Sequence, residues 1–162
     1  MAKTSLTADE VLTLLAESPR RIAAVTADVA PARLRRRPRS DEWSANDVLA
    51  HLRSCADMWG SCIAAMLAQD KPTLRAIDPR TWMKQTDYPE LDFRRSFRSF
   101  TKQRADLLAV LEPLPRKGWS RSATVTGAGA LLERTVLFYA QWLARHERTH
   151  VKQIERIVNP TR

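Results

Sequence analysis

The chain contains three histidines, and all three lie where a helix would bury an apolar side chain. His146 and His150 fall between Leu143 and Ile154 of a helical apolar stripe, so their side chains lie one turn apart on one face. His51 has the same inward position in a second amphipathic stretch. Burying imidazoles without partners is costly, so something must satisfy them. Three inward imidazoles from two helices favour a divalent metal site, for Zn²⁺, Ni²⁺ or a similar ion, with a coordination position left open.

Length and composition predict one globular domain over residues 1–162. The 162 residues are 44% hydrophobic, which suits a single core. No apolar run is long enough to span a bilayer, and the N-terminal segment has no signal-peptide pattern, so we expect a cytoplasmic protein. Cys55 and Cys62 are about 10 Å apart along one helix and cannot pair with each other.

The charge balance is basic, with a formal net charge of +9. The densest cluster is the segment 33–39, which contains five arginines. No nucleic-acid-binding motif or interleaved aromatic platform accompanies it, so nucleic acid is not the favoured partner. The cluster is better read as a solvated loop or as a patch that attracts anionic small molecules.

Apolar periodicity predicts four long helices and no convincing strand, apart from a short extended piece at 123–126. A capping box at Thr7 starts the first helix, and Pro19 either kinks it or divides it. Ser44 caps the second helix. The expected helices cover about residues 7–29, 44–69, 91–111 and 131–158. This pattern predicts an all-α four-helix bundle.

The candidate ligands also constrain the topology. His51 lies near the start of the second helix, whereas His146 and His150 lie toward the end of the fourth. The two levels meet only if these helices are antiparallel, because parallel helices would separate them by about 16 Å. The bundle is therefore expected to be up-down-down-up, with the segment 70–90 as a long crossover connector between the second and third helices.

The later part of this connector should return to the metal end of the bundle. It carries two cations and two aromatic residues, Arg80, Trp82, Lys84 and Tyr88. These are candidate substrate-binding residues, with the cations for a carboxylate or phosphate and the aromatics for an apolar body. The alternative is a solvated strap whose Trp82 only packs on the bundle.

Three further residues lie one turn or less from the histidines. Asp47 and Gln153 are candidates to orient the metal ligands through hydrogen bonds. Gln153 is equally compatible with an ordinary solvated position. Asp47 or Cys55 could instead close the metal site, although Cys55 is more simply read as a small buried side chain.

The segment 146–150 also has the H-E-x-x-H form of zinc proteases, in which Glu147 would be the general base. We do not favour this interpretation, because only twelve residues follow His150 and a third ligand would have to lie well downstream. Helical periodicity also predicts that Glu147 points away from the stripe.

Two segments together resemble the DinB/YfiT-like family of metalloenzymes. They are Glu42-Trp-Ser-Ala-Asn-Asp-Val-Leu-Ala-His51-Leu and His146-Glu-Arg-Thr-His150-Val-Lys-Gln-Ile154. The resemblance covers essentially the whole chain and implies an up-down-down-up bundle, a divalent metal held by three histidines, and a homodimer. Carried over to this chain, the ligands fall on His51, His146 and His150.

The resemblance leaves the reaction open. Characterised branches of the family transfer low-molecular-weight thiols, which makes a thiol S-transferase acting on a small molecule the leading expectation. Catalysis would use a water or thiol whose pKa the metal lowers. A metal-dependent hydrolase is the alternative, and a non-enzymatic metal-binding or nucleic-acid-binding bundle is the further one.

Overall fold

The computed structural model describes residues 5–160. Residues 1–4 and 161–162 lie outside this range. The expectation that the N-terminal segment has no signal-peptide pattern falls partly on residues 1–4. Four long helices form the bundle: α1 (Ala8–Thr26), α3 (Ala45–Ala68), α5 (Phe93–Leu111) and α7 (Val136–Val158). Helix α7 packs against α1 and α3, and α5 packs against the same two helices. Among the described residues, no helix is long and apolar enough to cross a membrane.

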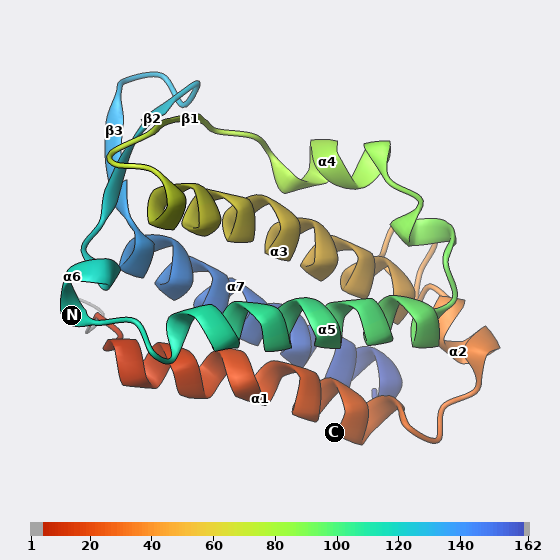
Figure 1. Ribbon diagram of the computed structural model, residues 1–162. Coiled ribbons are helices and arrows are strands. Elements are labelled where there is room, and N and C mark those ends of the chain that lie inside the picture. The colour runs from red at the N-terminus through yellow and green to blue at the C-terminus, as the bar shows by residue number, and fades with distance from the viewer. Residues whose placement is uncertain (1–4, 161–162) are drawn as a thin grey trace.

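The helices run in the expected directions. Figure 1 shows α1 and α7 running one way along the bundle and α3 and α5 running the other. Helices α3 and α7 are therefore antiparallel neighbours. The parallel pair α3 and α5 needs a connector that returns along the bundle, and this segment passes over α3 in Figure 1. The four-helix bundle of the sequence prediction is confirmed.

The connectors contain more regular structure than expected, and the prediction of an all-α protein is wrong in one respect. A three-stranded sheet in the order β1-β2-β3 lies at the end of the bundle where α3 ends and α7 begins. The expected extended piece at 123–126 belongs to its central strand, which pairs with two segments that showed no alternation. The shorter elements are α2 (Pro31–Arg35), β1 (Thr73–Arg75), α4 (Pro79–Gln85), η1 (Tyr88–Glu90), α6 (Arg116–Trp119), β2 (Ser122–Thr126) and β3 (Leu132–Thr135).

Local capping explains where α1 and α3 begin. The Thr7 and Ser44 hydroxyls each accept a hydrogen bond from the backbone N–H three residues later. Glu10 and Asp47 reciprocate by accepting from the N–H of the capping residue, which completes both capping boxes. Both helices therefore begin where the sequence predicts.

Pro19 does not divide α1, which is one continuous helix. Proline has no N–H, so the carbonyl of Leu15, four residues earlier, loses its usual helical donor. The guanidinium of Arg104 on α5 supplies one instead, with its Nη1 2.9 Å from the Leu15 oxygen. A missing hydrogen bond in α1 thus becomes an attachment point for α5.

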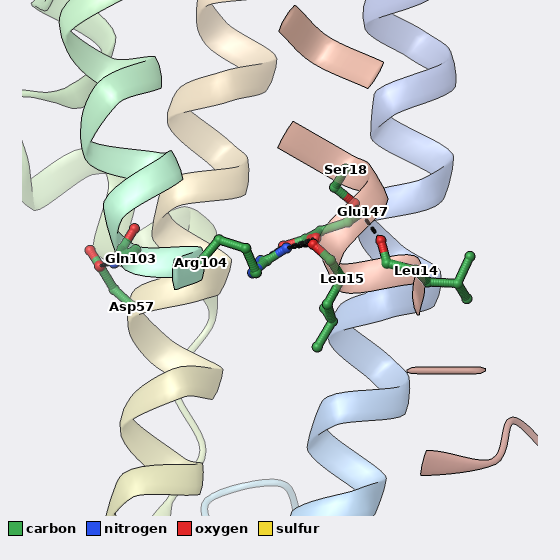
Figure 2. A network of polar contacts seen from close by, with 7 residues as sticks. All are labelled: Leu14, Leu15, Ser18, Asp57, Gln103, Arg104 and Glu147. Atoms are coloured by element: carbon green, nitrogen blue, oxygen red, sulfur yellow. Dashed lines mark hydrogen bonds and ion pairs between the residues drawn. The ribbon is translucent and has the colours of Figure 1, made fainter. Parts of the chain in front are cut away.

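The same arginine forms a buried ion pair with Glu147 on α7 (Figure 2). The two side chains are 2% and 0% exposed, and the contact is bidentate, with Nη1 2.7 Å from Oε1 and Nη2 bonded to Oε2. Glu147 was expected to point away from the apolar stripe, and this expectation is wrong. It occupies the core position of the stripe itself, and His146 and His150 lie on its flank.

The ion pair divides the apolar core into two clusters. Along α7, Leu143 belongs to the cluster at the sheet end and Val151 to the cluster at the opposite end, with Glu147 between them. Along α5, Leu111 and Phe100 are divided by Arg104 in the same way. We call Ser18, Arg104 and Glu147 the polar layer, since all three are buried at this level of the bundle.

Removing one charge of the pair should destabilise the fold strongly. Glu147→Gln leaves the Arg104 guanidinium, which cannot lose its proton, buried without a counter-charge. We expect the free energy of unfolding to fall by ~3–5 kcal/mol in urea titrations.

Glu155→Gln on the same helix is the matched control. Glu155 pairs with Arg21 where both side chains are about one-third exposed, so its loss should cost under about 1 kcal/mol. The double variant Arg104→Met/Glu147→Leu removes both charges and should recover part of the loss. Equal effects of Glu147→Gln and Glu155→Gln would show that the polar layer contributes little.

Candidate metal centre

The antiparallel contact between α3 and α7 brings the three histidines together. The Nε2 atom of His146 lies 3.2 Å from Nε2 of His51 and 3.2 Å from Nε2 of His150. The ring centroids are 4.4–5.0 Å apart. His51 is buried, whereas His146 and His150 are only half-buried, so the expectation that all three face the core is right for His51 alone.

These distances fit a common metal ion. Zinc–imidazole bonds of about 2.0–2.1 Å with tetrahedral angles place two ligand nitrogens about 3.3 Å apart. The observed separations of 3.2 Å agree with that value. The imidazoles carry too few protons at these nitrogens for all three to be satisfied by hydrogen bonds to one another. A divalent cation would satisfy them by binding their lone pairs.

Gln153 supplies the hydrogen bond that orients one ligand. Its Oε1 lies 2.8 Å from Nδ1 of His150, one turn earlier on α7. An amide oxygen can only accept, so Nδ1 carries the proton and Nε2 presents its lone pair to the other imidazoles. The Nδ1 atoms of His51 and His146 are buried and have no hydrogen-bond partner among the described residues.

Burial keeps the imidazoles neutral. Together with a smaller effect of the neighbouring His150, it lowers the pKa of His51 to about 4 and that of His146 to about 3. Burial also lowers the pKa of His150, while the hydrogen bond to Gln153 opposes the change. The exposed Arg80 of α4 acts in the same direction on all three rings, which places its positive charge near the site. Neutral imidazoles are the form that binds metals.

Cys55 lies closer to the histidines than the sequence indicated. Its Sγ is 3.6 Å from Nε2 of His51, and the donor atoms of His51, Cys55 and His146 all lie within 4.8 Å of one another. A zinc ion bound to both sulfur and imidazole would separate these two atoms by about 3.5 Å. Burial, followed by the negative charge of Glu147, raises the pKa of the Cys55 thiol. The geometry admits this residue as a ligand, whereas its surroundings disfavour the thiolate.

Asp47 has other contacts than those expected of a residue that orients a metal ligand. Its Oδ2 accepts from the backbone N–H of Ser44 at 3.0 Å and lies 3.3 Å from Nε of Arg37. The carboxylate is thus occupied at the N-terminus of α3, where a negative charge stabilises the helix.

The connector residues divide between two faces of α3. Trp82 Nε1 and the Tyr88 hydroxyl both donate to Oδ2 of Asp57, at 2.9 and 2.6 Å, and Gln103 of α5 donates to Oδ1 (Figure 2 shows Asp57 and Gln103). Trp82 and Tyr88 line a cavity of about 570 Å³ between α3 and α5, which none of the histidines lines. Arg80 and Lys84 are exposed on α4, and substrate binding by Arg80, Trp82, Lys84 and Tyr88 stays a prediction.

Two tryptophans cover the imidazoles. The Trp43 ring lies 5.1 Å from the ring of His51 and 6.4 Å from that of His150. Trp59 meets His146 edge-on at 5.1 Å. The sequence suggested Trp43 only as an apolar contact at the helix entrance. The position of Trp59 in the α3 stripe, two turns after His51, was the available signal for the second contact.

The fold is an up-down-down-up helical bundle, and two antiparallel helices of this bundle bring three imidazoles and a thiol together. The chain is therefore a helical-bundle protein with a candidate metal centre. The sequence profile of the DinB superfamily matches residues 14–154, and the chain therefore belongs to that superfamily. A search of curated proteins finds no match.

A solved structure supports the fold. YfiT from Bacillus subtilis, described as "a probable metal-dependent hydrolase with an unusual four-helix bundle topology", superposes with a TM-score of 0.79. The alignment covers 97% of this chain and 90% of YfiT, with 17% sequence identity. At that identity the likeness shows the fold alone.

The lowered histidine pKa values predict how the stability of the metal-free protein depends on pH. In the unfolded chain the imidazoles return to the ordinary value of 6.5, so between that value and about 4 the unfolded state binds more protons. The free energy of unfolding should therefore fall as the pH is lowered from about 7 to about 4. Urea titrations of chelator-treated protein measure this fall.

The control is the variant His51→Asn/His146→Asn, which lacks the two imidazoles and keeps every carboxylate of the wild type. Its stability should change less over the same pH interval. Identical slopes for the two proteins would show that these imidazoles are not held neutral by the fold.

Proposed function

We propose that this chain is a metal-dependent enzyme acting on a small molecule, with one divalent ion, Zn²⁺ or Ni²⁺, held by His51, His146 and His150. The observation that carries the proposal is that Nε2 of His146 lies 3.2 Å from Nε2 of His51 and 3.2 Å from Nε2 of His150. Membership of the DinB superfamily supports it. The ion supplies a Lewis acid that lowers the pKa of a water or thiol held at its open position.

The chain's own residues would orient the ligands and restrict water. Gln153 fixes the tautomer of His150, and such a contact is typically worth 10–100-fold in metal affinity. Trp43 and Trp59 pack on the rings and limit their rotation. Arg80 adds positive charge beside the site, which favours substrates with an anionic group.

We infer thiol transfer to an electrophilic small molecule as the reaction. The two carboxylates nearest to the ligands in sequence are both occupied, Asp47 in the helix cap and Glu147 in the buried ion pair. Neither is free to act as a general base. A thiol, with an ordinary pKa of about 8.5, loses its proton far more readily than water and makes a smaller demand on such a base.

Hydrolysis is the second candidate, and the fold likeness to YfiT favours it. Proteolysis of the H-E-x-x-H type is not proposed, because the bidentate bond to Arg104 removes Glu147 from the site. The homodimer implied by the family resemblance stays a prediction.

Metal analysis tests the site. His146→Asn and His150→Asn should each reduce stoichiometric metal, measured by elemental analysis, to a small fraction of the wild-type value. Cys55→Ser is the matched control, because it changes the neighbouring donor, and it should retain the metal. Full occupancy in both histidine variants would refute the proposed ligand set.

Cobalt substitution then decides the role of Cys55. The wild-type protein loaded with Co²⁺ should lack the intense near-ultraviolet band of cobalt–thiolate bonding. A band that disappears in Cys55→Ser would show that cysteine closes the site. A closed site of this kind is typical of structural zinc and would count against catalysis.

The reaction is tested with paired substrates. Metal-loaded protein should consume a low-molecular-weight thiol together with an electrophile such as 1-chloro-2,4-dinitrobenzene, and this activity should be lost with the metal. Cleavage of p-nitrophenyl esters without thiol turnover would favour the hydrolase.

The role of Arg80 is tested with an anionic electrophile. Arg80→Ala should raise KM for this substrate and leave the metal content unchanged. Lys84→Ala removes the other, exposed cation of α4 and shows whether Lys84 also contributes to substrate binding.

A further inference from the structure

A second cavity lies against the outer side of the histidine cluster. It has a volume of about 730 Å³ and forms where α2 and the segment after it meet the end of α7. Part of the arginine cluster 33–39, for which the sequence offered only a loop or an anion-attracting patch, contributes to it. The lining residues that could contact a polar ligand are Arg33, Arg36, Glu42, Trp43, Gln153 and Arg156.

The charges that line this cavity favour an anion. Three arginines line it, Arg33 and Arg36 from the α2 region and Arg156 from α7, and Glu42 is the one acidic residue of the lining. Arg33 is held in place, since its Nη2 donates to the carbonyl of Val158 at 2.7 Å. Arginine presents a planar fork of donors that matches carboxylate and phosphate oxygens.

Two side chains belong to both the cavity and the candidate metal centre. Trp43 lines the cavity and packs on the rings of His51 and His150. Gln153 lines the cavity and bonds Nδ1 of His150. A molecule seated among the arginines would therefore lie against the residues that orient the imidazoles.

We propose that this cavity, which we call the arginine cavity, binds the oxyanion of the substrate, a carboxylate or phosphate group. The inference rests on the proposed function and narrows its substrate class to anionic small molecules. The volume lies within the range of roughly 300–1,000 Å³ that small-molecule sites occupy. The arginines from the α2 region and from α7 would hold the anionic group while the rest of the molecule extends past Trp43 toward the histidines.

The test is direct binding of two probe anions, inorganic phosphate and succinate, by isothermal titration calorimetry at low salt. The double variant Arg36→Gln/Arg156→Gln removes two lining charges and leaves the structural contact of Arg33. One lost charge-assisted hydrogen bond is worth about 1.5 kcal/mol, or about 10-fold in affinity, so the loss of two should lower the affinity by about 100-fold. The probe that binds more tightly identifies the substrate anion as phosphate or carboxylate.

The matched control is Arg39→Gln/Arg148→Gln. It removes the same net charge from exposed residues of the same two regions, neither of which lines the cavity. Its affinity should change by less than about 2-fold. Equal losses in both double variants would show diffuse charge attraction and overturn the proposal, as would absence of binding of either probe to the wild type.

Titrations of chelator-treated and metal-loaded protein separate this inference from the proposed function. No histidine lines the arginine cavity, so phosphate or succinate should bind in both forms, and Arg36→Gln/Arg156→Gln should retain its metal. Anion binding in a protein that fails the metal analysis would refute the metal site and leave the arginine cavity in place. Metal binding without anion binding would do the reverse.

Discussion

The buried contact of Arg104 with Glu147 and with the carbonyl of Leu15 is the constraint on which the rest of the bundle depends. It joins α1, α5 and α7 at one level, and the Leu15 carbonyl is open to Arg104 because Pro19 cannot donate to it within the helix. An ion pair this deep is not by itself evidence of stability, since two charges lose their hydration. Its stronger effect is on specificity, because α7 can neither rotate nor slide without separating the charges. That fixed rotation directs the flank of α7 that carries the histidines toward α3.

The same geometry explains why the imidazoles are accessible. If His146 and His150 had filled the core stripe, as the sequence suggested, no substrate could reach them through the packed interior. With Glu147 in that position, they lie at the edge of the α3–α7 contact, half-buried and covered by aromatic rings. The connectors over α3 and around α2 then form the surroundings of the site, as expected where a rigid scaffold presents loops.

Periodicity and capping predicted the four helices, and the positions of the histidines predicted that α3 and α7 are antiparallel. The polar layer was not predicted, although the sequence contains its signal. Arg104 and Glu147 are opposite charges at apolar positions of two stripes, and periodicity alone does not pair them. Of the sheet, only the central strand was anticipated, as the extended piece at 123–126. Strands β1 and β3 are three and four residues long, and β1 is a parallel partner of β2 far away in the chain, so no local pattern reveals these two strands.

The division of the core by the polar layer has a consequence for the motions of the protein. Apolar contacts hold each end of the bundle together, but along α5 and α7 they are interrupted at the level of the ion pair. Amide protection against hydrogen exchange should therefore fall into two cooperative units. Opening of the half that carries α2, Trp43 and the arginine cavity then need not break the apolar contacts of the half that carries the sheet.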